Sequence, residues 1–275
     1  MANSLRTLTL LFGLLLVSGC GLLPEVEDET KGWSAQRFYS AASTSMANGD
    51  YEKAIKYYEG LESRYPFGRF AMQSQLDVAY AYYKNNQPEA AIAAANRFIK
   101  LHPRNPHIDY AYYLRGIVNF NRNMGFIARF VPMDTSQRDP GSVRNSFDYL
   151  KELVVRFPDS RYTDDARRRM VYLRNNLAMH EIHVARYYLK RGGYLAAANR
   201  AKKVIEDYQR TPAVKEAMEV MIIAYDELGM TELYNDAVRV LAYNEARGTF
   251  EDLDEGAGEV SLGKQAWDFL ELDKN

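Results

Sequence analysis

A six-residue motif that recurs along the chain constrains its fold more than any other sequence feature. It occupies residues 49–54 and 86–91, and in both copies a proline, Pro66 or Pro103, follows twelve residues after the final alanine. Glycine at the start of the motif interrupts the helix and lets the chain turn into a helical hairpin, and alanine permits close contact between the two helices. The proline ends the second helix because it cannot continue one. The pattern therefore predicts helix pairs that repeat every 37 residues.

Three weaker copies extend the repeat. They lie at 146–158, with a disrupted turn, at 192–197, where Gln209 replaces the proline, and at 229–234. Glycine, aromatic, alanine and proline at these offsets are typical of tetratricopeptide repeats. Residues 161–191 contain neither glycine nor proline and keep a helical apolar period. We therefore predict an all-α tetratricopeptide-repeat solenoid of about five helix pairs, with one long helix near residues 161–191.

The N-terminus has the pattern of an export signal. Arg6 is the sole charge in residues 1–19, an apolar run covers residues 8–17, and small residues precede Cys20, the chain's single cysteine. The run is too short to span a bilayer. Residues 17–20 resemble a bacterial lipobox, in which the cysteine is lipidated, and Gly21 favours the outer membrane by the same resemblance. An ordinary signal peptide or a buried cysteine are the alternatives.

These features divide the chain into six segments. They are a signal peptide at 1–19, the lipidated cysteine and a flexible linker at 20–34, N-terminal repeat units at 35–125, an insertion at 126–141, C-terminal repeat units at 142–248, and an acidic linker and tail at 249–275. Apolar residues in the insertion suggest that it folds back on the solenoid. The apolar cluster near Trp267 either docks on a surface or is disordered.

Catalytic and metal-binding patterns are weak. The histidines at 180 and 183 are three residues apart rather than four, which does not fit the metalloprotease motif. Residues 258–265 nearly match a phosphate-binding loop, but Gln265 replaces the Ser or Thr that holds magnesium. A formal net charge of −1 argues against nucleic acid. We therefore predict a non-enzymatic protein without a cofactor or metal.

Tyrosine is abundant, with 21 copies against 12 Phe and 2 Trp. Several aromatic residues fall at positions of the first helix in each unit that line the concave groove of such solenoids. The expected groove residues are Tyr39, Leu76, Tyr80, Tyr83, Tyr110, Tyr113 and Phe120. Tyrosine suits the binding of an apolar or aromatic peptide, because it joins a large ring to a hydrogen-bonding tip. The alternative is that half of them pack between helices. If they bind a peptide, Tyr→Ala changes at Tyr80, Tyr83 or Tyr113 should weaken its capture without unfolding.

Longer motifs resemble a known family. Several segments are similar to the BamD family of β-barrel assembly lipoproteins: the lipobox, residues 51–54 with 64–68, residues 156–162, residues 173–178, Glu181 with residues 184–188, and residues 199–200. The resemblance covers roughly residues 20–245. It implies a periplasmic scaffold, lipid-anchored to the outer membrane, whose N-terminal half recognises C-terminal signals of unfolded outer-membrane proteins. It also implies that the C-terminal half docks the periplasmic domains of a BamA-like barrel protein.

The docking candidates in the C-terminal half are Arg186, Asn199, Arg200 and Glu219. Other lipoproteins of the complex, such as a BamC-like subunit, are further expected partners. A second function class stays open, in which a tetratricopeptide lipoprotein binds peptidoglycan or regulates a murein enzyme. The first class predicts co-purification with a barrel protein, and the second predicts binding to the sacculus.

Overall fold

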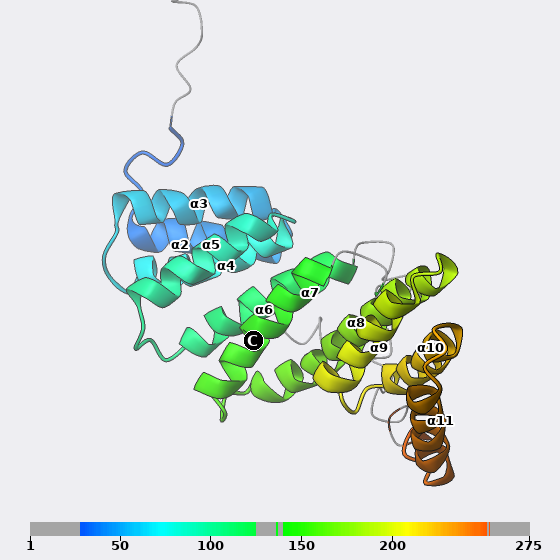
Figure 1. Cartoon of the computed structure of the whole chain (residues 1–275). Helices are drawn as coiled ribbons and strands as arrows, with labels where there is room; N and C mark the ends of the chain where they lie inside the picture. The colour runs from blue at the N-terminus through cyan, green and yellow to red at the C-terminus, as the bar shows by residue number, and fades with distance from the viewer. Residues whose placement is uncertain (1–27, 125–135, 137–139, 252, 254–275) are drawn as a thin grey trace, which may run out of the picture.

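The structure, a computed structural model, describes residues 28–124, 136, 140–251 and 253. Ten α-helices occur in these ranges, without a strand, and they follow one another as five pairs (Figure 1). The pairs are α2(Ala35–Ala47) with α3(Tyr51–Arg64), α4(Arg69–Lys84) with α5(Pro88–Leu101), α6(Ile108–Met124) with α7(Pro140–Arg156), α8(Thr163–Lys190) with α9(Tyr194–Asp207), and α10(Ala213–Glu227) with α11(Thr231–Ala246). The prediction of an all-α solenoid of about five pairs is confirmed.

The turn inside a pair depends on one residue with a positive φ angle. Gly49, Gly192 and Gly229 have φ of 76°, 72° and 67°, and Asn86 takes the same place in the second pair at 57°. Glycine has no Cβ to clash in this left-handed region, and asparagine is among the few other residues that tolerate it. This conformation turns the chain back so that the second helix packs on the first. Alanines of the second helices, Ala54, Ala91 and Ala197, are fully buried at that contact.

The predicted long helix is also confirmed. Helix α8 has 28 residues and carries two acidic residues in its first turn, Asp164 and Asp165, which the positive end of the helix dipole stabilises. Its first half contributes Leu173 to one hydrophobic cluster and its second half contributes Ile182 to another. Helix α8 therefore joins two separately packed parts of the solenoid.

The two clusters differ in composition. The N-terminal cluster extends from Phe38 to Leu177 and contains large aromatic and aliphatic side chains from α2 to α8. The C-terminal cluster lies between α8, α9 and α10 and consists mostly of alanine. Its buried members are Ala178, Ile182, Ala185, Ala197, Ala201, Val204, Ala213, Ala217 and Val220. Helix α11 packs on α10 but contains no buried residue.

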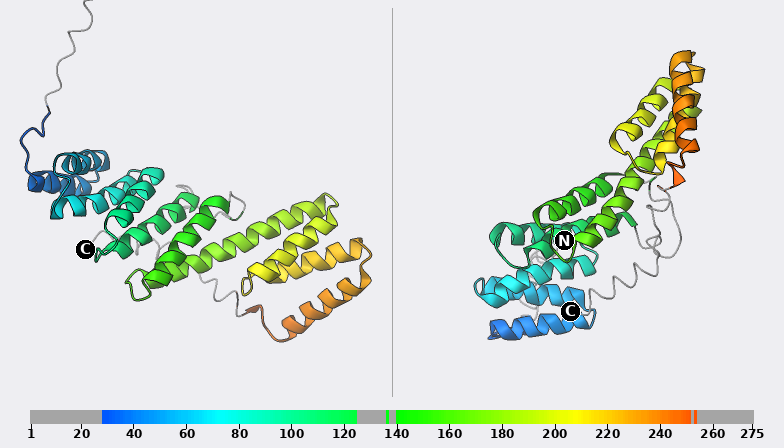
Figure 2. Two further views of the ribbon diagram at one scale, coloured as in Figure 1. Left: turned by 60° about the vertical axis from the view of Figure 1, so that its left-hand side comes forward. Right: turned by 90° about the horizontal axis from the view of Figure 1, so that it is seen from below.

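The first helices of the pairs form the inner face of the stack. Helix α2 contacts α4, α4 contacts α6, and α8 contacts α10, whereas the second helices of neighbouring pairs contact each other less. The closer spacing of the first helices makes their side concave. Figure 2 shows the pairs as one elongated, twisted stack. This geometry brings residues of α2, α4 and α6 onto one continuous face.

Several predicted features lie outside the described residues. They are Cys20 with the signal peptide, most of the insertion 126–141 and most of the tail 249–275. In the part of the chain that the structure describes, no helix is both long enough and apolar enough to cross a bilayer.

Candidate peptide-binding face and partner-docking surface

One end of the inner face is a corner between α2 and α4. The Tyr39 hydroxyl donates a hydrogen bond to Asp77 Oδ2 at 2.9 Å, and Gln73 Nε2 donates to Asp77 Oδ1 at 2.9 Å. Burial raises the pKa of the Asp77 carboxyl, although these two hydrogen bonds act in the opposite direction. Burial also raises the pKa of Tyr39, and the nearby Asp77 adds to this effect. The corner thus offers an aromatic ring beside a carboxylate that costs free energy to ionise.

Tyr80 and Tyr83 lie near the C-terminal end of α4. Both are half-buried, and their ring centroids are 6.0 Å apart. The Tyr83 hydroxyl accepts a hydrogen bond from the Asn121 side chain of α6. The two tyrosines are therefore partly accessible, and Tyr83 is held by the neighbouring helix α6.

Tyr110, in the first turn of α6, completes the accessible aromatic residues. Its ring centroid is 5.5 Å from that of Tyr162, which precedes α8. Burial raises the pKa of Tyr110 well above the ordinary value for tyrosine. We call Tyr39, Tyr80, Tyr83 and Tyr110 the aromatic inner face.

The structure places the other three expected groove residues in the core. Leu76, Tyr113 and Phe120 are only 3%, 2% and 2% exposed. Leu76 packs with Phe98 and Ala111. The structure therefore gives these residues a packing role in the free protein. Tyr113→Ala should accordingly destabilise the fold, which removes this residue from the set of changes expected to leave folding intact.

The reason for the burial of Tyr113 is a network with α8 that the sequence did not indicate. Its ring stacks on Tyr162, with centroids 4.8 Å apart, and its hydroxyl donates to Asp165 Oδ2 at 2.6 Å. Asp165 also accepts from Arg169 Nε at 2.5 Å. The Arg169 guanidinium lies 4.7 Å from the centroid of the Phe120 ring. The contacts of Tyr113 and Phe120 with Tyr162, Asp165 and Arg169 cross about 50 residues of sequence, so no local pattern could reveal them.

A buried carboxylate on α8 binds partly exposed cations of α7 and α9. Glu181 is 1% exposed, and its carboxylate accepts from Arg200 Nη1 at 2.8 Å and from Lys203 Nζ at 2.7 Å. Burial alone would raise the pKa of Glu181, but the hydrogen bonds from Lys203 and Arg200 hold that pKa below its ordinary value. Arg144 of α7 lies 3.9 Å from the same carboxylate. Glu181 therefore ties three helices together.

This cluster changes the interpretation of the docking candidates. Arg200 binds Glu181 inside the chain, and Arg186 forms an ion pair with Glu216 of α10 at 2.5 Å. Both arginines therefore contribute to the fold. Asn199 and Glu219 are exposed.

The last pair also carries an apolar surface that is open to solvent. We define the α10–α11 surface by its exposed large hydrophobic residues, which are Ile223, Leu228, Met230, Leu233, Val238, Val240 and Tyr243. A concentration of such residues on the terminal pair is unusual for a capping helix, which normally presents a polar outer side. It is typical of a protein-binding surface.

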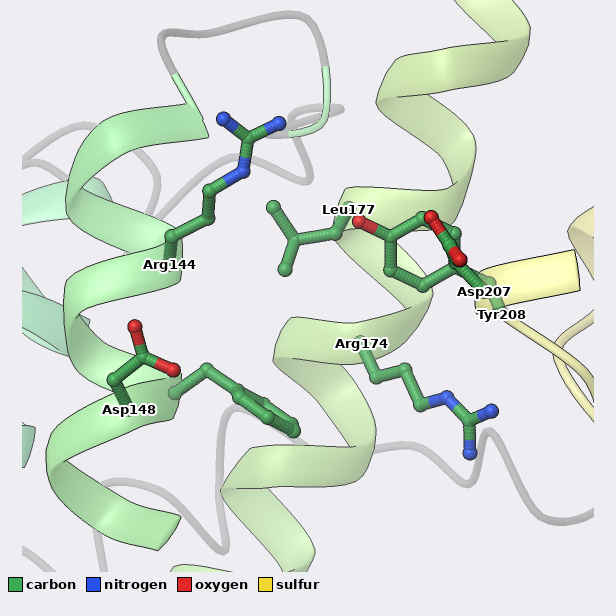
Figure 3. A pocket seen from close by; sticks show the side chains of 7 residues that line it. Arg144, Asp148, Arg174, Leu177, Asp207 and Tyr208 are labelled. Carbon is green, nitrogen blue, oxygen red and sulfur yellow. The ribbon is translucent and has the colours of Figure 1, made fainter. Parts of the chain in front are cut away.

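A cavity of about 260 Å³ lies where the two parts of the solenoid meet. Figure 3 shows that Arg144 and Asp148 reach it from α7, Leu177 and Arg174 from α8, and Tyr208 from the end of α9. The guanidinium groups of Arg144 and Arg174 and the carboxylates of Asp148 and Asp207 thus surround apolar side chains such as Leu177. This mixed charged and apolar lining could contact both the polar and the apolar groups of a ligand.

The two histidines of α8 have local partners. His180 Nδ1 is 2.8 Å from the Ser136 carbonyl oxygen, and His183 Nε2 is 2.9 Å from the Ser136 hydroxyl. Across the described residues, no three His, Cys, Asp or Glu side chains gather closely enough to hold a metal ion. The contacts of His180 and His183 attach one residue of the insertion to the middle of the stack.

Comparisons with a protein family and with individual proteins point to the same group of outer membrane proteins. The family described as "YfiO: Outer membrane lipoprotein" matches residues 32–241. The outer membrane protein assembly factor BamD of Neisseria meningitidis serogroup A is 45% identical, over 88% of this chain and 92% of its own length. BamD of Vibrio cholerae is 35% identical, over 87% of this chain and 98% of its own length. The chain therefore belongs to the YfiO family of outer membrane lipoproteins, together with the BamD assembly factors.

Proposed function

We propose that this protein is a non-enzymatic scaffold subunit of the outer-membrane β-barrel assembly complex. The observation that carries the proposal is the 45% identity to an outer membrane protein assembly factor across 88% of the chain. A five-pair helical solenoid fits this role, because it presents long surfaces for other chains.

The aromatic inner face is the proposed binding site for C-terminal signals of unfolded outer-membrane proteins. Tyr39, Tyr80, Tyr83 and Tyr110 are only partly buried, so each packs against the core and keeps part of its surface accessible. Such residues bind with little loss of side-chain entropy. A signal that ends in an aromatic residue could stack on these rings and hydrogen-bond to their hydroxyl groups.

The C-terminal pairs are the proposed docking site for the periplasmic domains of a BamA-like barrel protein. The α10–α11 surface supplies apolar area, and the exposed Asn199 and Glu219 supply polar contacts. Because Arg186 and Arg200 already bind Glu216 and Glu181, their contribution to docking would be to hold the helices in place. A BamC-like lipoprotein is a further proposed partner.

The proposed location is the periplasmic face of the outer membrane, with Cys20 as the lipid attachment site. The sequence pattern at residues 1–21 supports this assignment. Stable anchoring requires more than one acyl chain, which lipidation at a lipobox cysteine would provide.

Affinity purification of the mature protein from detergent-solubilised envelopes tests the scaffold role. A large β-barrel protein should co-purify, and Leu233→Asp with Val240→Asp should reduce its recovery without altering the helical content. Absence of a barrel protein, together with sedimentation of the chain with the sacculus, would instead favour the peptidoglycan-binding alternative.

Photo-crosslinking of a peptide with a C-terminal aromatic residue tests the inner face. Tyr83→Ala should lower the crosslinking yield severalfold, whereas Tyr187→Ala, which alters a 55% exposed tyrosine on α8, should leave it unchanged. Thermal unfolding of both variants checks that the fold is intact. Crosslinks confined to residues beyond 190 would contradict the assignment.

A further inference from the structure

The first described residues, 28–33, pack on one edge of the solenoid, at the end of α3. Arg64, at the end of α3, donates from Nη1 to the Thr30 carbonyl oxygen at 2.5 Å and forms an ion pair with Asp28. The Tyr65 hydroxyl donates to the Trp33 carbonyl oxygen at 2.7 Å. These contacts fasten the N-terminal segment beside the connection between α3 and α4.

The three connections between the first four pairs lie next to one another on that edge. Asn105 Nδ2, between α5 and α6, is 3.2 Å from Met72 Sδ near the start of α4. Ser160 Oγ, between α7 and α8, donates to Asp109 Oδ2 at 2.6 Å near the start of α6. Figure 1 shows these connections on one side and the turns inside the pairs on the other. We define the tether edge as residues 65–69, 100–107 and 157–162.

The tether edge combines exposed apolar side chains with cations. Phe67 is 90% exposed, the highest fraction among the exposed large hydrophobic residues, and Leu101 at the end of α5 is 54% exposed. Neither has an evident packing role. An isolated exposed aromatic residue next to basic residues is typical of a contact with the lipid headgroup region.

Four cations of this edge have no acidic partner. They are the exposed residues Arg69, Lys100, Arg104 and Arg161. Among the described residues, no carboxylate lies within 4.0 Å of a side-chain nitrogen of any of the four. Asp159 is the one carboxylate within the tether edge. Within these three segments the cations therefore outnumber the carboxylates, while Asp28, which pairs with Arg64, and Asp109, which accepts from Ser160, lie beside them.

We propose that the tether edge lies against the anionic phospholipid surface, with Phe67 in the headgroup region. This inference rests on the proposed lipid anchor, because Cys20 and Asp28 are eight residues apart and can be separated by at most about 28 Å. The anchor would therefore hold this edge near the bilayer at a high effective concentration. Each of these cations would raise the equilibrium constant for membrane binding about fivefold, and salt would screen this attraction. Such contact would orient the solenoid relative to the membrane.

Fluorescence quenching tests the position of Phe67. The lipidated mature protein carrying Phe67→Trp is reconstituted on vesicles of phosphatidylethanolamine and phosphatidylglycerol at 3:1, with brominated acyl chains. Tyr187→Trp is the control, because Tyr187 lies about 36 Å along α8 from the first residue of that helix. The added tryptophan emission at position 67 should be quenched at least twofold more than that at position 187. Equal quenching would overturn the proposal.

Vesicle binding of the unlipidated full-length mature chain, Cys20→Ser, tests the charges. Changing Arg69, Lys100, Arg104 and Arg161 to Gln should weaken binding at least tenfold, and 0.5 M salt should have a similar effect. The control changes the exposed Lys53, Lys56, Lys190 and Lys202 to Gln, which removes the same charge, and should alter binding less than threefold. Equal losses in both sets, no vesicle binding by the parent chain, or binding of an acidic peptide in place of vesicles would each overturn the inference.

The two tests separate this inference from the scaffold role. Vesicle binding by the Cys20→Ser chain does not require a barrel protein, and co-purification of a barrel protein does not require the four cations. Loss of co-purification with intact vesicle binding would remove the scaffold role and leave the membrane contact. The opposite result would remove the membrane contact alone.

Discussion

The N-terminal and C-terminal parts of the solenoid use one repeat pattern but pack differently. In the first three pairs, side chains such as Phe38, Leu114 and Leu150 are at most 1% exposed. In the last two pairs alanine dominates the core, and α11 has no buried residue. Large side chains bury more apolar area per residue, so the N-terminal part should be the more stable. The C-terminal part leaves its apolar surface for a partner to cover, which fits the proposed division between substrate binding and docking.

Truncation of one leucine from each part should reveal the largest difference. Leu173→Ala removes a fully buried side chain of α8 and should lower the free energy of unfolding by about 2–5 kcal/mol. Leu233→Ala removes a 46% exposed side chain of α11 and should change that free energy by less than about 0.5 kcal/mol. Urea denaturation followed by circular dichroism measures both. Similar losses would show that α11 is packed as tightly as the N-terminal core.

Adding a methyl group should distinguish the two parts by a smaller amount. In Gly116→Ala the new Cβ would lie 2.6 Å from Leu150 Cγ, which the packed core cannot move. The expected loss is about 1–3 kcal/mol even though alanine favours helix formation. In the matched Gly193→Ala change the nearest atom is Tyr188 Cδ1 at 3.4 Å, an ordinary contact. A thermal melt in which Gly116→Ala is as stable as the parent would contradict the tight α6–α7 contact.

The buried carboxylate of the C-terminal part should depend on pH in a defined direction. The pKa of Glu181 is held below the ordinary value of 4.5, so its ion pairs stabilise the folded state at neutral pH and lose this effect as the pH falls below about 4.5. Glu181→Gln should cost about 1–2 kcal/mol at pH 7, because the partner cations stay about two-fifths exposed. The difference should shrink towards pH 3.

A control with an exposed carboxylate keeps this prediction specific. Glu206, which pairs with Lys202 at the surface, is 60% exposed, and Glu206→Gln should leave stability nearly unchanged at every pH. If the stability of Glu181→Gln and that of the control follow the same pH curve, the ion pairs of Glu181 do not stabilise the packing of α8 on α9.

The carboxylate of the N-terminal part should give the opposite sign and the smallest effect. Burial raises the pKa of Asp77, so the folded state binds the proton more tightly and gains stability as the pH falls through that raised pKa. Asp77→Asn removes the charge while its amide oxygen can still accept from Tyr39. At pH 7 the free energy of unfolding of the variant should equal that of the parent or exceed it by less than about 1 kcal/mol. A clear destabilisation at pH 7 would show that the charge itself is needed.

The repeat architecture could be predicted because its determinants are local. The turn residue, the buried alanine and the terminal proline each act within a few positions of the chain, and the absence of glycine and proline from 161–191 predicted α8 in the same way. The residues of the groove were predicted less completely than the repeat architecture. A helical period shows on which side of its own helix Tyr80 or Tyr113 lies, but the burial of each depends on what packs there.

The contrast between these two tyrosines separates local from tertiary information. Residue types at fixed offsets specified the helix pairs, the long helix and the motifs of the family, since backbone conformation responds to near neighbours. The stacking of Tyr162 on Tyr113 and the bonds of Arg200 and Lys203 to Glu181 join residues that are distant in sequence. Those contacts exist only after the pairs stack, because stacking decides which side chains lose water and which keep it.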